Sequence, residues 1–175
     1  MTPTVKLPHV KEMMTGRVLG IPENYSILDA LTFFNKHRIS MAPIIQSTRT
    51  EKADGKNILG VLTQSKIAKY LMTEIFHDEF QAVPVTNVML SSLPFAQDSW
   101  DIFELEEFFR NNDINHTLVQ NSEKQLVGVV SKRDVLVKLE GVAVEFLNYK
   151  RNLMEPVELT KIEKILLQFT FKGER

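Results

Sequence analysis

Apolar and polar positions follow a pattern that occurs twice along this chain. In each copy a short apolar run precedes a segment with helical spacing; two apolar runs joined by a polar turn and a second helical segment follow. Strands joined by a short polar turn pair antiparallel, so each copy predicts a small β-α-β-β-α unit. The expected strands are 18–21, 41–46 and 58–63 in the first copy and 93–96, 117–120 and 126–131 in the second.

The two copies align at an offset of 75 residues, without a gap, for more than thirty positions. Ile27 then falls on Ile102, and Phe34 falls on Phe109. A longer loop at 47–57 reduces the offset to 68, after which 60–63 aligns with 128–131. A repeat of this length is longer than solenoid periods, so we expect a tandem of two similar units.

The helices carry signals of their own. Ser26 with Asp29, and Asp101 with Glu104, have the spacing of a capping box at the start of the first helix of each copy. The second helices are expected at 64–75 and 132–139. The predicted buried stripes are Ile27, Ala30, Leu31 and Phe34 in one copy and Ile102, Leu105, Phe108 and Phe109 in the other.

One unit is too small to bury a good core alone, so the predicted fold is α+β, with units 8–75 and 84–140 packed sheet to sheet. A helical extension, 142–175, follows and is divided by Pro156. Its apolar stripe either packs on the chain's own core or docks a second copy or a partner protein. The stripe consists of Leu159, Ile162, Leu166 and Phe169.

Composition narrows the classes of function. The net charge of −1 gives no electrostatic ground to expect nucleic acid or a membrane as partner, and no apolar run is long enough to cross one. The absence of cysteine excludes disulfides and cysteine-ligated metals, and a cytoplasmic location is the default expectation. The four histidines lack the spacing of a helical metal pair, and no catalytic motif is present. We therefore expect that the protein is not an enzyme and that it has no metal site.

The segment 128–134 has the sequence Gly-Val-Val-Ser-Lys-Arg-Asp, which predicts a buried strand that turns into a helix at Ser131. Free backbone N–H groups at such a turn suit a phosphate. The alternative is a plain capping box, in which Ser131 caps the first turn and Asp134 reaches back. In the first copy, Thr63 and Lys66 occupy the matching positions.

Three features together resemble a pair of cystathionine-β-synthase (CBS) domains, the arrangement called a Bateman module. They are Met14-Thr15 with Met89 at the matching place, the strand 41–45 with its proline, and the 128–134 motif. The resemblance covers about residues 8–140. It implies a regulatory module, often assembled as a dimer, that binds an adenosine-containing ligand between the paired units. The expected ligand is AMP, ADP, ATP or S-adenosylmethionine, with no required cofactor and an unidentified partner protein.

Carried onto this sequence, the resemblance implies that Ser131 holds phosphate and Asp134 holds the ribose hydroxyls, for which a carboxylate is a suitable acceptor. Lys132 and Arg133 add cations beside the phosphate, or else form a solvated helix face. The base is expected between two strand segments of the second unit. Their residues are Ser92, Leu93, His116 and Thr117.

Lys66 departs from the family pattern, because an ammonium group cannot accept hydrogen bonds from ribose. We therefore expect the Thr63 and Lys66 cleft to be empty, the alternative being that Lys66 holds an anion. Leu118 replaces the strand proline of the second copy. One competent site per chain is predicted. The rival function is a ligand-free interaction or dimerisation module, in which the 131–134 motif is only a helix cap.

Overall fold

The structure is a computed structural model that describes residues 7–46, 53, 55, 57–73, 82–92 and 94–153, with side chains up to Val144. The expected stripe of 159–169, the helix break at Pro156 and the site residue Leu93 lie outside the described residues.

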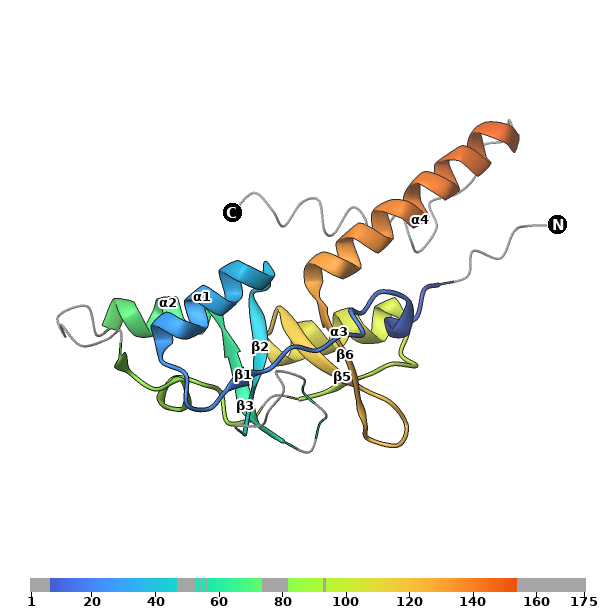
Figure 1. Cartoon of the computed structure of the whole chain (residues 1–175). Coiled ribbons are helices and arrows are strands. Elements are labelled where there is room, and N and C mark those ends of the chain that lie inside the picture. Colours follow the sequence, from blue (N-terminus) through green and yellow to red (C-terminus); the bar gives the residue numbers. More distant parts are fainter. Residues whose placement is uncertain are drawn as a thin grey trace.

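Two three-stranded sheets of identical topology form the fold (Figure 1). The first unit runs β1 (Ile21–Pro22), α1 (Ile27–His37), β2 (Met41–Ile45), β3 (Ile58–Thr63) and α2 (Gln64–Thr73). The second unit runs β4 (Ala96–Gln97), α3 (Ile102–Asn112), β5 (His116–Gln120), β6 (Leu126–Ser131) and α4 (Lys132–Leu153). In each sheet the first strand pairs parallel with the second, which pairs antiparallel with the third. The predicted α+β tandem is confirmed.

The strand register repeats as the alignment predicts. Met41 pairs with Thr63 in one sheet, and His116 pairs with Ser131 in the other. The first strand of each unit is shorter and begins later than predicted.

Both predicted capping boxes are present. Ser26 accepts the amide of Asp29 and donates its own amide to the Asp29 carboxylate, and Asp101 and Glu104 do the same for α3. The buried stripe of α1 differs in one position, because Phe33 is fully buried and Leu31 only half-buried. Phe108 in α3 is likewise half-buried, against the prediction.

The leading segment of each unit, meaning the residues just ahead of its first strand (8–20 and 82–92), packs in the core of the other unit. Val10, in the 3-10 helix η1 (Val10–Glu12), is buried among the side chains of α3, β6 and α4. Val85, in η3 (Val85–Asn87), is buried among those of α1 and β2. Backbone hydrogen bonds hold these segments in place. The Thr15 amide donates to the Val129 carbonyl at 2.9 Å, and the Val129 amide donates to the Thr15 carbonyl at 3.0 Å. Leu90 and Val61 form the matching pair at 2.8 and 2.9 Å.

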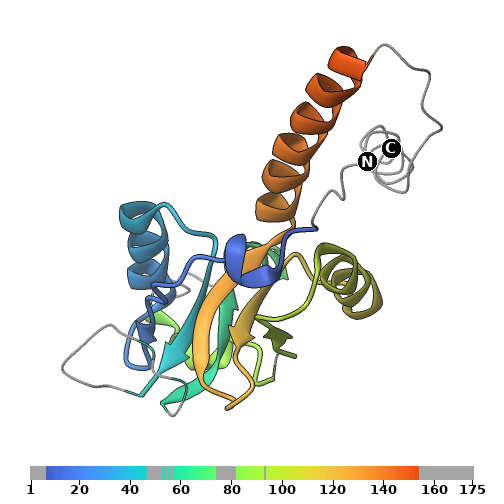
Figure 2. The same ribbon diagram turned by 90° about the vertical axis from the view of Figure 1, so that its right-hand side faces the viewer.

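A third apolar cluster lies between the two sheets and combines residues of both units, including Met41, Val61 and Leu118. The units therefore pack sheet to sheet, as expected. The second helix of the second unit, predicted to stop at 139, continues unbroken to Leu153. Figures 1 and 2 show α4 extending away from both sheets as a rod.

Candidate functional site

The Ser131 and Asp134 pair forms a closed capping box at the junction of β6 and α4. One carboxylate oxygen, Asp134 Oδ2, accepts the Ser131 amide at 2.7 Å and the Ser131 hydroxyl at 2.6 Å. The Asp134 amide donates to Ser131 Oγ at 3.3 Å. Among the described residues, Asp134 Oδ1 has no protein partner. The cap expected as the alternative interpretation is thus present, and it leaves one carboxylate oxygen available to accept another hydrogen bond.

A groove of about 260 Å³ passes Asp134 and separates α4 from the leading segment of the chain. Glu12 and Met13 form one wall, while the wall on α4 includes Arg133, Asp134 and Val137. The ladder between Thr15 and Val129 holds the leading segment in place beside β6. Residues before the first unit therefore stand beside the motif of the second unit.

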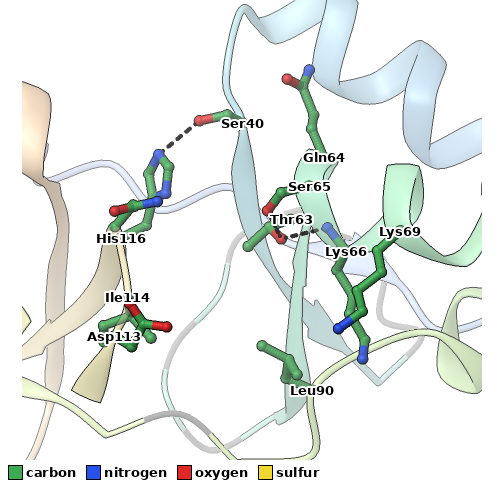
Figure 3. A pocket seen from close by; sticks show the side chains of 11 residues that line it. Ser40, Thr63, Gln64, Ser65, Lys66, Lys69, Leu90, Asp113, Ile114 and His116 are labelled. Carbon is green, nitrogen blue, oxygen red and sulfur yellow. Dashed lines mark hydrogen bonds between the residues drawn. The ribbon is translucent and has the colours of Figure 1, made fainter. Parts of the chain in front are cut away.

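A larger cavity, of about 460 Å³, lies beside the corresponding helix start of the first unit and is shared with the second unit (Figure 3). Thr63, Lys66 and Lys69 line one side, and residues 113–116 of the second unit line the other. The Lys66 amide donates to Thr63 Oγ1 at 3.0 Å, as the Asp134 amide donates to Ser131 Oγ, but position 66 has no carboxylate to complete the box. The Thr63 hydroxyl also pairs with Ser65 at 2.9 Å. The first helical turn here is capped by a hydroxyl alone.

The structure divides the expected base-binding residues between different places. The His116 side chain lines the Thr63 and Lys66 cavity, although its backbone pairs with Ser131. Thr117 is fully buried, and its hydroxyl donates to the Pro94 carbonyl at 2.6 Å. Ser92 is exposed and does not line the Asp134 groove. Lys132 is half-buried at the start of α4, where its amide donates to the Asn115 carbonyl at 2.9 Å.

Each cleft takes its second wall from a distant part of the chain: Glu12 and Met13 for the Asp134 groove, and residues 113–116 for the Lys66 cavity. Sequence reasoning missed Glu12, Met13 and Ser40 as neighbours of the two clefts. The sequence did contain a signal of these contacts. A methionine is repeated ahead of the first strand of each unit (Met14 and Met89), and a glycine is repeated in the last strand (Gly60 and Gly128). A Cβ on Gly128 would lie 2.6 Å from Met14 Sδ, and one on Gly60 would lie 2.5 Å from the Leu90 carbonyl oxygen.

His116 joins the two units through a hydrogen bond of 2.8 Å between its Nε2 and Ser40 Oγ (Figure 3). Burial lowers the pKa of His116 below its ordinary value, and the negative charge of Asp134 opposes this shift. The imidazole therefore stays neutral near pH 7.

The described residues contain no group of three or more potential metal ligands. None of the helices in the described part of the chain is long and apolar enough to cross a membrane.

Comparison with known proteins agrees with this architecture. The CBS domain family matches the sequence twice, over residues 10–73 and 81–141. No curated protein matches the chain. Among solved structures, the CBS domain pair of protein MJ0100, in complex with 5-methylthioadenosine and S-adenosyl-L-methionine, is 20% identical with a TM-score of 0.63, over 78% of this chain and 98% of that one.

Two further structures are similar. The CBS domain of a bacterial CNNM/CorC family Mg²⁺ transporter, in complex with ATP, is 21% identical with a TM-score of 0.59 and covers 76% of this chain and 87% of its own. The CBS-domain protein ATU1752 from Agrobacterium tumefaciens is 19% identical with a TM-score of 0.64, over 78% of this chain and 96% of its own. The two family matches together span well over half of the sequence, and each contains the strands and helices of one unit together with the segment that leads into it. The chain therefore belongs to the CBS domain family and contains a tandem pair of these domains.

Proposed function

We propose that this chain is a regulatory module, not an enzyme, and that it binds an adenosine-containing ligand in the groove beside Ser131 and Asp134. The observation that carries the proposal is the Asp134 carboxylate on the groove wall, with Oδ1 unpartnered among the described residues. An ionised carboxylate accepts hydrogen bonds from ribose hydroxyls. The similar structures solved with S-adenosyl-L-methionine and with ATP support the same class of ligand.

The cations of the groove suit the charged end of a nucleotide. Arg133 is exposed next to Asp134, and Lys138 lines the same groove one turn further along α4. A guanidinium group can bind two phosphate oxygens at once, which makes Arg133 the better phosphate ligand of the two. AMP, ADP and ATP can engage these cations with their phosphates, whereas S-adenosylmethionine has no phosphate and offers only its carboxylate.

The signal would leave the module through α4. Ser131 is the last residue of β6, and the helix that carries Arg133 and Asp134 continues to Leu153 (Figure 2). A ligand held between α4 and residues 12–13 would stabilise one position of this helix relative to the leading segment. Such coupling requires that the ligand bind the two positions with different affinity.

The test is calorimetric titration of the ligand-stripped protein with AMP, ADP, ATP and S-adenosylmethionine. Asp134→Asn is the test variant, and Asp29→Asn is the matched control, because Asp29 makes the same capping box in α1 away from the groove. Both variants should lose similar stability, about 0.5–2 kcal/mol for a damaged cap. Only Asp134→Asn should lose affinity, by about tenfold or more for a lost charge-assisted hydrogen bond.

The rival is a ligand-free module for dimerisation or for an unidentified partner protein. Its support is the closed capping box and the apolar surface of α4, where Val137 is 63% exposed and Val144 is 52% exposed. Absence of binding to all four ligands, or equal affinity in wild type and Asp134→Asn, would favour this rival.

A further inference from the structure

Lys66 and Lys69 bring two positive charges to one wall of the larger cavity. They lie three residues apart on α2, a spacing that places them on the same face of the helix. Figure 3 shows the two side chains running alongside each other, with both ammonium groups ending near Leu90. Within the described part of the chain, neither ammonium group pairs with a carboxylate. Two like charges held together in a concave site repel each other, and a bound anion would relieve this repulsion.

The rest of the lining adds donors but little negative charge. The hydroxyls of Thr63 and Ser65 lie on the same side as the lysines, and His116 lies opposite. The Gln64 amide group points away from the two ammonium groups and donates to the Ile39 carbonyl at 3.4 Å. Asp113, also opposite, is the one carboxylate among the described lining residues. The cavity thus carries two lysines against one aspartate, and its charge is separated between the two walls.

We infer that this cavity binds a compact phosphate anion of the pyrophosphate class, through Lys66 and Lys69, without using a nucleoside. The position that carries Asp134 in the second unit is Lys66 here, so the acceptor for ribose hydroxyls is missing. A volume of about 460 Å³ has room for two phosphate groups. The two neighbouring ammonium groups can each contact one of them, as point charges that do not need a fixed geometry. The inference is independent of the Asp134 groove and holds whether or not that groove binds a nucleotide.

Asp113 gives the inference a second, opposite consequence. A carboxylate across the cavity repels a bound anion, so removing its charge should strengthen binding. Asp113 has a φ of 50°, a left-handed conformation that asparagine tolerates well. Asp113→Asn therefore changes the charge of the wall without straining the backbone, and a purely structural role of the lining would not produce tighter binding.

Calorimetric titration of the full chain with sodium pyrophosphate, in a buffer without divalent ions, tests the inference. Wild type should show saturable binding at one site per chain. Lys66→Met with Lys69→Met should weaken it by about tenfold or more, since two charge-assisted contacts are lost. Lys36→Met, which removes an exposed lysine of α1 outside the cavity, should leave it unchanged. Asp113→Asn should tighten it.

Asp134→Asn separates this site from the proposed nucleotide groove. Pyrophosphate affinity should be unchanged in this variant even where AMP affinity is lost. The inference is overturned if wild type shows no saturable binding, if the double lysine variant binds as tightly as wild type, or if Asp134→Asn weakens pyrophosphate binding. It is also overturned if adenosine, which carries no phosphate, displaces pyrophosphate from the cavity.

Discussion

Ser40 and His116 meet across the boundary between the two units, with Ser40 Oγ 2.8 Å from His116 Nε2. Ser40 immediately precedes β2, and His116 is the first residue of β5, so the contact lies where the two sheets approach each other. The same imidazole lines the Lys66 cavity and experiences the charge of Asp134. It is therefore a physical link between the two units at the wall of the Lys66 cavity.

This link predicts a loss of stability in mild acid. Burial holds the pKa of His116 below 6.5, so the unfolded chain takes up a proton there more readily than the folded chain. The contribution of His116 to the free energy of unfolding should be complete above pH 6.5 and should fall as the pH drops below it. Urea unfolding of wild type and His116→Gln between pH 7.5 and 5 measures this.

His116→Gln keeps a side chain that can hydrogen-bond to Ser40 but cannot titrate. Its free energy of unfolding should decline less than that of wild type over the same range. Asp113, Lys66 and Lys69 line the same cavity and remain in both proteins, so their own contributions cancel in the difference. The attraction of Asp134 for a protonated imidazole exists only in wild type and opposes the decline. Parallel declines in the two proteins would show that His116 does not titrate in this window.

The exchange of leading segments predicts an unusual sensitivity at two glycines. A Cβ at Gly60 would meet the Leu90 carbonyl oxygen at 2.5 Å, and one at Gly128 would meet the Met14 sulfur at 2.6 Å. Gly60→Ala should cost more than Gly128→Ala, because a backbone oxygen yields less easily than the end of a methionine side chain. Each should reduce the free energy of unfolding by about 1–3 kcal/mol, the range for overpacked sites.

Gly141→Ala is the control for these substitutions. Among the residues that the structure describes, none has an atom within 4 Å of the Cβ position at Gly141, which is in the interior of α4. The substitution should therefore raise the free energy of unfolding by about 0.5–1 kcal/mol through helix propensity alone. Thermal unfolding of the three variants provides the comparison. If Gly60→Ala and Gly128→Ala were as stable as wild type, the close approach of the leading segments would be wrong.

Lys66→Asp should convert the first cleft to the chemistry of the second. The new carboxylate can accept the Thr63 amide as Asp134 accepts that of Ser131, which should add about 0.5–1 kcal/mol of stability to α2. Pyrophosphate binding should be lost, and the stoichiometry for the adenosine ligand should rise from one to two. Titration calorimetry measures the binding and its stoichiometry, and thermal unfolding measures the stability.

Lys69→Asp is the matched control, since it places the same charge in the same cavity away from the capping position. It should also abolish pyrophosphate binding, but it should add neither stability nor a second nucleotide site. A second site in both variants, or in neither, would contradict a specific role for the residue at position 66.

The local order of the fold could be predicted from the sequence, because the signals that fix it are local. The Ser26 and Asp29 cap, the strand from Leu126 to Ser131 and the turn into α4 each depend on neighbouring residues. Duplication then predicted the matching register of the two sheets. The length of α4 was not predictable from the same signals, because Gly141 interrupts its pattern without ending the helix.

The walls of the two clefts could not be predicted in the same way. Thr117 was expected to contact the base, yet its neighbour is the Pro94 carbonyl, and it is fully buried. Glu12 and Met13 reach the Asp134 groove only because Val10 enters the distant core of the second unit. Contacts of this kind depend on which of the two cores a leading segment packs in. The apolar periodicity within one unit does not indicate that choice.

The crossing of these segments means that the boundary between the two repeats in the sequence is not a boundary in the fold. A fragment that stops before Val85 would retain Val10 without the core that buries it, and its own core would lack Val85 and Val88. Each half could be completed only by the leading segment of another half, on the same polypeptide or on a second one. Because each core includes a segment from the other half, we expect the two halves to unfold together, while their clefts remain free to differ in charge, as Lys66 and Asp134 do.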